Sequence, residues 1–236
     1  MINYFRILIF VIFALGFSLE AAAPGSHLFF AEWWIDANGI FDQNCRDEFI
    51  IGNLFPDIRY LGTVKRRMTH VKGVNKDDIK NADSYFRAGI LLHSFVDEER
   101  EKFVKKYKIF KKLDFIPKKG RVFFLKLLED EILWENINLP QAQSALESIY
   151  PEEADTGVDL ETINEWHSLM IDYFKQKPSV LLKNLKEKDL GFLHADKETV
   201  AKWSEILPIL AKDPDFIQYM EKLIAHFDRR CCINHH

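Results

Sequence analysis

His93 and Asp97 lie four residues apart in the segment "AGILLHSFVDEERE" at residues 88–101, where they interrupt a run of apolar side chains. At about 3.6 residues per turn, the two side chains would share one face of a helix, one turn apart. Apolar residues occupy both that face and the opposite one, so the helix should be buried. A buried ionisable group needs a partner, because desolvating a charge is costly. The spacing therefore predicts a buried helix in which this pair binds each other, other residues or a metal ion.

Further histidines and carboxylates lie in apolar or conformationally restricted contexts. They are His27 in "PGSHLFFAEWW", Asp57 in "GNLFPDIRYLG", His70 in "RRMTH", and Glu129, Asp130 and Glu131 in "LLEDEILW". Imidazole and carboxylate ligands without cysteine suit zinc or another first-row metal better than calcium. Together these residues predict a metal site built from nitrogen and oxygen ligands.

Each of these residues also has an ordinary structural interpretation. His93 and Asp97 could simply hydrogen-bond to each other, and His27 could be a helix-start residue among aromatic neighbours. Asp57, which follows a proline, could cap a helix. The acidic run at 129–131 could be a solvated edge, although the apolar residues around it leave little room for one.

Length and composition limit the fold and the possible partners. The 236 residues are 47% hydrophobic, which is enough for one good core or two small ones. The formal net charge is −4, with 32 Lys and Arg against 36 Asp and Glu. That balance argues against strong overall electrostatic binding of nucleic acid, while a local basic patch remains possible. Arg59 and the basic run "KRR" at 65–67 could steer a phosphate, or the run could form a solvated surface.

Helical periodicity dominates the chain, and no run alternates with period two. We therefore predict an all-α protein with a single multi-helix domain over residues 24–228. A polar, irregular stretch is expected at 57–80 and a flexible tail at 229–236. The predicted helices cover residues 26–37, 47–55, 81–110, 121–137, 141–149, 159–175, 178–187, 197–211 and 214–228.

The N-terminus has the pattern of a signal peptide over residues 1–23. A weakly basic start precedes the apolar run "ILIFVIFALGF", which is too short to span a bilayer, and small residues follow. Cleavage after Ala21 fits this pattern, and an uncleaved anchor is the alternative. We expect a secreted or periplasmic protein in an oxidising compartment. Cys45 could then form a disulfide with Cys231 or Cys232.

The order of the candidate residues resembles the zinc-dependent phospholipase C family, whose superfamily includes the single-strand-specific zinc nucleases. The resemblance rests on His27, "GNLFPDI", "TH" and "AGILLHSFVD", and covers roughly residues 25–100. It implies an all-helical domain that holds a cluster of zinc ions in a cleft. It also implies a set of metal ligands: His27, Asp57, His70, His93 and Asp97.

The sequence departs from the family pattern in two places. The second histidine expected shortly after Asp97 is missing from "EEREKF" at 98–103, and a later His-x-x-x-Glu is missing at its expected distance. Asp130, or its neighbour Glu129, could supply a substitute carboxylate, and we favour Asp130. The pair His194 and Glu198 has the right spacing but lies much later in the chain. With two imidazoles fewer, we expect one or two zinc ions.

The resemblance implies a zinc-dependent hydrolase of phosphodiesters or phosphomonoesters, with phospholipid head groups as the leading substrate. Asp57 is the candidate to orient the attacking water or to act as base. Such an enzyme would contact a membrane surface transiently, and we expect no stable nucleic-acid partner; the oligomeric state stays open. One alternative is a non-catalytic secreted protein with a structural metal site. Another is a zinc-dependent nuclease that stacks bases on Trp33, Trp34 or Tyr60, although these aromatic residues fit core packing better.

Overall fold

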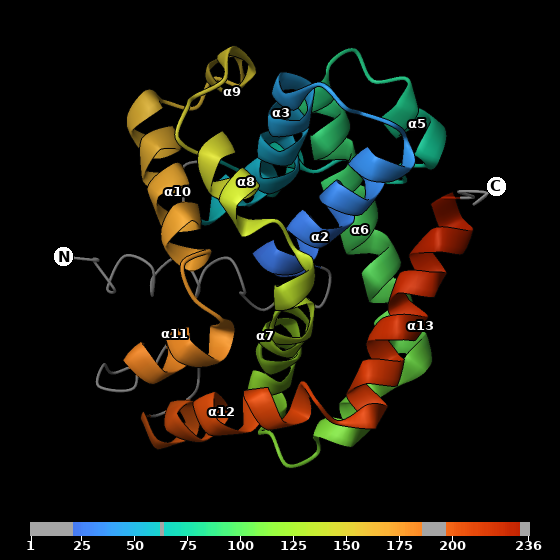
Figure 1. The fold of residues 1–236 in the computed structure, drawn as a ribbon, viewed down its shortest axis with the longest axis vertical. Helices are drawn as coiled ribbons and strands as arrows, with labels where there is room; N and C mark the ends of the chain where they lie inside the picture. Colours follow the sequence, from blue (N-terminus) through green and yellow to red (C-terminus); the bar gives the residue numbers. More distant parts are fainter. Residues whose placement is uncertain (1–20, 62–63, 186–196, 232–236) are drawn as a thin grey trace. The chain divides into compact units, whose positions relative to one another are not determined.

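The computed structural model describes residues 21–61, 64–185 and 197–231, and in these ranges it contains helices and no strand (Figure 1). The predicted all-α fold class is confirmed. No described helix has the length and apolar content needed to span a lipid bilayer. The α-helices are α2 (Pro24–Ala37), α3 (Gln43–Leu54), α4 (Arg66–Thr69), α5 (Lys76–Lys80), α6 (Tyr85–Tyr107), α7 (Arg121–Leu133), α8 (Leu139–Ala145), α9 (Pro151–Asp155), α10 (Leu160–Tyr173), α11 (Pro178–Leu185), α12 (Lys197–Leu210) and α13 (Pro214–Cys231).

The described chain folds into two compact units, each built from segments that are distant in sequence. The first unit contains residues 21–23, 99–135, 176–185 and 197–231, and the second contains the remaining described residues between 24 and 175. Neither unit is therefore a continuous stretch of chain. Helix α6 contributes its first part to the second unit and its last part to the first.

In the second unit, helices α3 and α6 approach each other so closely that only glycine fits at two positions. A Cβ atom on Gly52 would lie 2.1 Å from the backbone oxygen of Phe86, and one on Gly89 would lie 2.3 Å from that of Phe49. The Asn53 amide also donates a hydrogen bond to the backbone oxygen of Gly89. Because backbone meets backbone here, the register between the two helices is fixed.

The remaining elements of the second unit pack around this pair of helices. Helix α2 contacts α3, and α8 covers α3 from another side and contacts α10 (Figure 1). A 3-10 helix, η1 (Phe55–Leu61), continues directly from α3 and contacts α4 and α10. The buried residues Trp34, Phe49 and Phe55 belong to this core.

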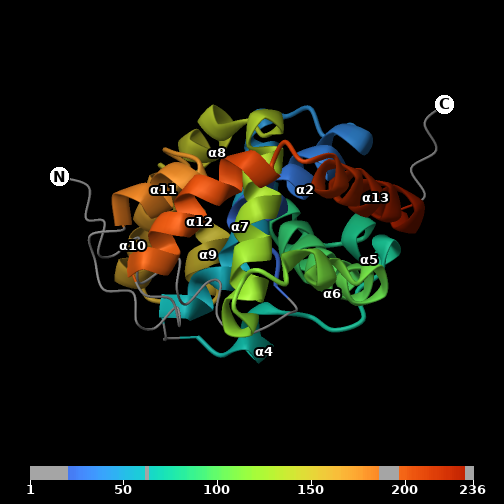
Figure 2. The ribbon, with the colours of Figure 1, turned by 90° about the horizontal axis from the view of Figure 1, so that it is seen from below.

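The first unit is assembled on helix α7. Helices α11 and α12 pack against each other and against α7, and α13 also contacts α7 (Figure 2). Gly120, just before α7, lies against the ring of Trp203, because a Cβ atom there would be 2.7 Å from the indole. The short segment Ala21–Ala23 is buried as well. The backbone oxygen of Ala21 accepts a hydrogen bond from Arg100.

The structure corrects the expected irregularity of residues 57–80. This stretch contains the end of η1 and the two short helices α4 and α5. Helix α5 forms because Asn75 and Asp78 make a reciprocal capping box, in which each side chain accepts from the other's backbone N–H. A cap, rather than apolar periodicity, therefore defines α5, whereas α4 is a single turn without a side-chain cap. Helix α9 was also not predicted, because it is a single short turn that starts at Pro151.

Two expectations near the C-terminus can also be compared with the structure. Helix α13 continues to Cys231, three residues into the segment expected to be a flexible tail. Cys45 is a free thiol on α3, so the possible disulfide from Cys45 to Cys231 is not formed. Cys232 lies outside the described residues, as does the apolar run of the predicted signal peptide at 1–20.

Candidate metal centre

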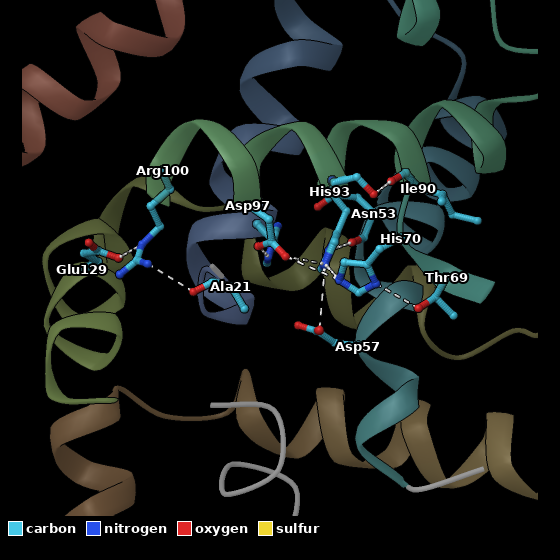
Figure 3. Close-up of polar contacts among 12 residues, drawn as sticks. Ala21, Asn53, Asp57, Thr69, His70, Ile90, His93, Asp97, Arg100 and Glu129 are labelled. Atoms are coloured by element: carbon cyan, nitrogen blue, oxygen red, sulfur yellow. Dashed lines mark hydrogen bonds and ion pairs between the residues drawn. The ribbon is translucent and has the colours of Figure 1, made fainter. Parts of the chain in front are cut away.

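Two overlapping groups of side chains in the second unit could hold a metal ion. Among the described residues, one group is His27, Asp57 and His93, and the other is His70, His93 and Asp97. Helix α2 carries His27, η1 carries Asp57, and α6 carries both His93 and Asp97. His70 follows the last residue of α4. Five of the six predicted ligands are thus brought together from four separate elements (Figure 3).

The backbone of α3 fixes the orientation of the His93 ring. Its Nδ1 lies 2.8 Å from the backbone oxygen of Asn53, which can only accept, so Nδ1 carries the proton. The lone pair is then on Nε2, which lies 3.6 Å from Asp97 Oδ2 and 3.8 Å from Asp57 Oδ1. The close packing of α3 on α6 at Gly52 and Gly89 puts the Asn53 carbonyl within reach of the ring. The local fold therefore leaves His93 in the tautomer that a metal ligand needs.

His70 turns its Nε2 toward the same point. Its Nδ1 is 2.9 Å from the Thr69 hydroxyl, and its Nε2 is 3.2 Å from His93 Nε2. The segment is held against α6 by a hydrogen bond from the backbone N–H of Val71 to the hydroxyl of Ser94. One proton shared as an N–H···N hydrogen bond would satisfy both nitrogens, and a cation bound by both would do so as well.

The atoms of the second group have the spacing of zinc ligands. His70 Nε2, His93 Nε2 and Asp97 Oδ2 are separated by 3.2, 3.4 and 3.6 Å. With zinc–ligand bonds of about 2.0–2.1 Å, the edge of a tetrahedron is about 3.3 Å. These three atoms therefore match one face of a tetrahedral site, and the donor set fits a zinc ion.

His27 adds a further donor beside this face. Its ring stacks on that of His93, with centroids 3.8 Å apart and planes only 8° from parallel. Its Nε2 lies 3.2 Å from Asp97 Oδ1, but neither ring nitrogen has a hydrogen-bond partner among the described residues, although the side chain is only 1% exposed. Buried polar atoms nearly always have a partner. A buried imidazole whose nitrogens have no hydrogen-bond partner is suited to bind a cation.

Burial and charge set the protonation states of the central pair. Burial, together with the charge of the neighbouring His27, lowers the pKa of His93 well below its ordinary value. Burial alone would raise the pKa of Asp97, but the surrounding imidazoles, His93 first, hold it well below the usual range. The imidazole is therefore neutral and the carboxylate ionised at neutral pH, which are the forms that bind metals.

Asp57 has a different environment from Asp97. Burial raises its pKa above the ordinary value, and the guanidinium of Arg59, 3.4 Å from Asp57 Oδ1, only partly offsets this. Arg59 also lies over the ring of Tyr60, 3.9 Å from the centroid, and contacts its hydroxyl. A carboxyl group with a raised pKa holds a proton more readily near neutral pH, which suits a group that exchanges protons with water.

Asp130, the sixth predicted ligand, belongs to neither group. It is fully buried on α7 in the first unit. Its neighbours have structural partners, because Glu129 accepts from Arg100 and Glu131 accepts from both the backbone N–H and the hydroxyl of Ser179. The acidic run is therefore buried, as its apolar context suggested, and is not a solvated edge.

The other predicted alternatives are also located by the structure. Two histidines outside the candidate centre have carboxylate partners: buried His167 lies 2.7 Å from Glu153, and His226 lies 2.9 Å from Glu99. His194 lies outside the described residues. Trp34 is buried in the core at 2% exposure, so it offers no surface on which to stack a base.

Two supporting contacts were not predicted from the sequence. The carbonyl of Asn53, which selects the His93 tautomer, is a backbone group and leaves no trace in the sequence. Arg66, whose Nη2 lies 3.3 Å from Asp97 Oδ2, was noted only as part of a basic run. The sequence offered one indication of this contact. Arg66 lies four residues before His70, a spacing that places two side chains on one face of a helical turn.

Comparisons with known proteins add no identification, because no family model, curated protein or solved structure matches this chain.

Proposed function

We propose that this protein is a zinc-dependent hydrolase of phosphoric esters, secreted or periplasmic, with phospholipid head-group esters as its leading substrates. The observation that carries this proposal is the convergence of His70 Nε2, His93 Nε2 and Asp97 Oδ2 at ligand spacing. The resemblance to the zinc-dependent phospholipase C family adds the reaction type. One or two ions are expected. His93 is shared between the two groups and its Nε2 can bind only one ion, so a second ion would need the other residues of its group.

The protein's own residues divide the work of the proposed reaction. His70, His93 and Asp97 would hold one zinc ion, and His27 and Asp57 lie where they could complete its coordination or hold a second. When bound, zinc acts as a Lewis acid toward a phosphoryl oxygen and makes water acidic enough to attack near neutral pH. The Asn53 carbonyl and the Thr69 hydroxyl orient the two imidazoles.

Asp57 is the residue that we assign to proton transfer. Its carboxyl group would accept a proton from the attacking water as the new oxygen–phosphorus bond forms. The bond from phosphorus to the leaving alcohol then breaks, and the alcohol oxygen takes up the proton that Asp57 accepted. The raised pKa of Asp57 suits this role, because a general base works best when its pKa lies near the working pH.

Replacement of His93 by alanine tests the metal centre. We expect the His93→Ala protein to lose bound zinc, measured by mass spectrometry of the metal after desalting, and to lose hydrolysis of a fluorogenic phosphocholine ester. His226→Ala is the matched control, because His226 contacts Glu99 in the first unit and should leave zinc and activity unchanged. If the His93→Ala protein keeps both its zinc and its activity, the proposal is wrong.

A non-catalytic metal site is the second candidate, and burial favours it. His27, His93 and Asp97 are each at most 1% exposed, which is typical of structural zinc sites that admit no water. One tightly held zinc ion with no hydrolysis of phosphocholine esters or single-stranded DNA would identify a structural site. Hydrolysis of the DNA rather than the phosphocholine ester would identify a nuclease.

A further inference from the structure

Two side chains from one short helical turn reach the same carboxylate oxygen of the candidate metal centre. Arg66 begins α4, and His70, four residues later, donates its backbone N–H to the Arg66 carbonyl. Arg66 Nη2 lies 3.3 Å from Asp97 Oδ2, and His70 Nε2 lies 3.4 Å from the same atom. The turn therefore sets a fixed positive charge directly beside an oxygen that we assign to zinc.

Arg66 is the most exposed side chain in contact with this centre. Its side chain is 35% exposed, whereas that of Asp97 is 1% exposed and that of His70 is 6% exposed. Arg59, the other guanidinium nearby, is 13% exposed and is engaged with Asp57 and Tyr60. Among the described residues that contact the centre, Arg66 is therefore the most accessible to a ligand arriving from solvent.

We propose that Arg66 binds the phosphoryl group of the substrate and so gives the site its preference for phosphoric esters. This inference rests on the proposed function, because it places the phosphoryl group beside the zinc that His70, His93 and Asp97 would hold. The guanidinium donates to two non-bridging oxygens, while the ester bond faces the attacking water. Arg59 is a positioning residue that holds Asp57.

The chemistry of arginine supports this assignment. A guanidinium has five N–H donors in a planar fork that matches two oxygens of a phosphoryl group. Its positive charge also offsets the negative charge that builds up on the phosphoryl oxygens during attack. A neutral carboxylic ester offers neither the charge nor the paired oxygens, so it would gain little from this residue.

The test measures the affinity of desalted, zinc-loaded protein for inorganic phosphate by calorimetry, alongside its zinc content. We expect Arg66→Ala to weaken phosphate binding by about tenfold or more, as loss of a hydrogen bond to a charged group does, with zinc content unchanged. The phosphate affinity of Arg66→Lys should lie between those of the wild type and Arg66→Ala, because lysine keeps the charge but not the planar set of donors. Arg67→Ala is the matched control, since it removes the same charge from an exposed neighbouring position.

The possible results separate this inference from the proposed function. If the wild type holds zinc and Arg66→Ala binds phosphate as tightly as the wild type does, the role of Arg66 is wrong while the metal centre stands. If Arg66→Ala and Arg67→Ala weaken binding equally, the effect is one of overall charge and the assignment also fails. If the wild type holds no zinc, both proposals fail together.

Discussion

Helix α6 carries two buried polar clusters that solve the same physical problem in opposite ways. In the first unit, Arg100 donates to Glu129 at 2.7 Å and to the carbonyl of Ala21 at 3.2 Å, while the hydroxyl of Tyr219 donates to Glu129 at 2.6 Å (Figure 3). None of the buried side-chain polar atoms of these residues lacks a partner in the described chain. This cluster is electrically balanced and complete.

The cluster in the second unit leaves buried polar atoms without hydrogen bonds. His70 and His93 share one contact between their Nε2 atoms, and both ring nitrogens of His27 lack a hydrogen bond. A structural cluster would gain stability by satisfying these atoms, as the Arg100 cluster does. The contrast teaches that burial alone does not indicate a function, whereas buried imidazole nitrogens without hydrogen bonds are suited to bind a cation.

The largest effect is expected when the complete cluster is broken. Glu129→Gln removes a negative partner of Arg100 and leaves the buried guanidinium without that counter-charge. We expect the free energy of unfolding to fall by about 3–5 kcal/mol, in the presence or absence of zinc, as measured by urea denaturation. Glu101→Gln is the control, because its ion pair with Lys105 lies on the exposed face of the same helix and should change stability little. A loss that zinc reverses would show that the two clusters are not independent.

The next largest loss of stability is expected from a steric change, which should also weaken the metal centre. Gly89→Ala would place a Cβ atom 2.3 Å from the backbone of Phe49, so α3 and α6 must separate. We expect a loss of about 3 kcal/mol in unfolding free energy, together with weaker zinc binding because the Asn53 carbonyl moves away from His93.

Gly73→Ala provides the comparison for this steric change. A Cβ atom there meets nothing within 4 Å but requires a φ of +69°, which should cost about 1 kcal/mol. Zinc affinity should stay unchanged in this variant, and equal losses of stability in the two proteins would contradict the close-packing argument.

The smallest effect concerns a carboxylate that has no strong counter-charge. Glu32 on α2 accepts only from the backbone N–H of Asn138, and burial raises its pKa to about 7, with nearby Asp36 adding to the shift. Because the folded protein holds this proton more tightly than the unfolded chain, the stability due to Glu32 is full below pH 4.5 and is lost as the pH rises through 7.

Glu32→Gln removes that pH dependence and keeps the acceptor for Asn138. We expect the variant to be more stable than the wild type at pH 8 by about 1 kcal/mol, after allowance for the partial exposure of Glu32. At pH 4 the two proteins should unfold at nearly the same temperature in calorimetry. A variant that is less stable than the wild type at pH 8 would mean that the ionised Glu32 stabilises the fold, which would contradict this prediction.

The parts of the site that follow helical periodicity were predictable. The spacing of His93 and Asp97 placed them on one face of a buried helix, and they lie there. The convergence of His27, Asp57 and His70 on that face depends on the tertiary fold, and only the family resemblance indicated it. Asp130 looked equivalent to these residues in sequence, since it too is a carboxylate in an apolar helix, yet it folds into the other unit.

The long helices were predicted within a few residues because apolar side chains recur along them. The short helices α4 and α5 were not, because each is only about one turn long. The capping contact between Asn75 and Asp78 decides α5, and α4 has no side-chain cap. The role of Arg66 also depends on such local geometry. A single turn of helix, rather than a long periodic pattern, brings its guanidinium to Asp97.

The buried position of Ala21 limits when a peptidase could cut beside it. A peptidase needs an extended, accessible strand of substrate, but the carbonyl of Ala21 accepts a hydrogen bond from Arg100 and Ala22 and Ala23 are inaccessible once the fold is complete. If the chain carries the predicted leader and it is cut after Ala21, the cut must therefore come before the first unit folds.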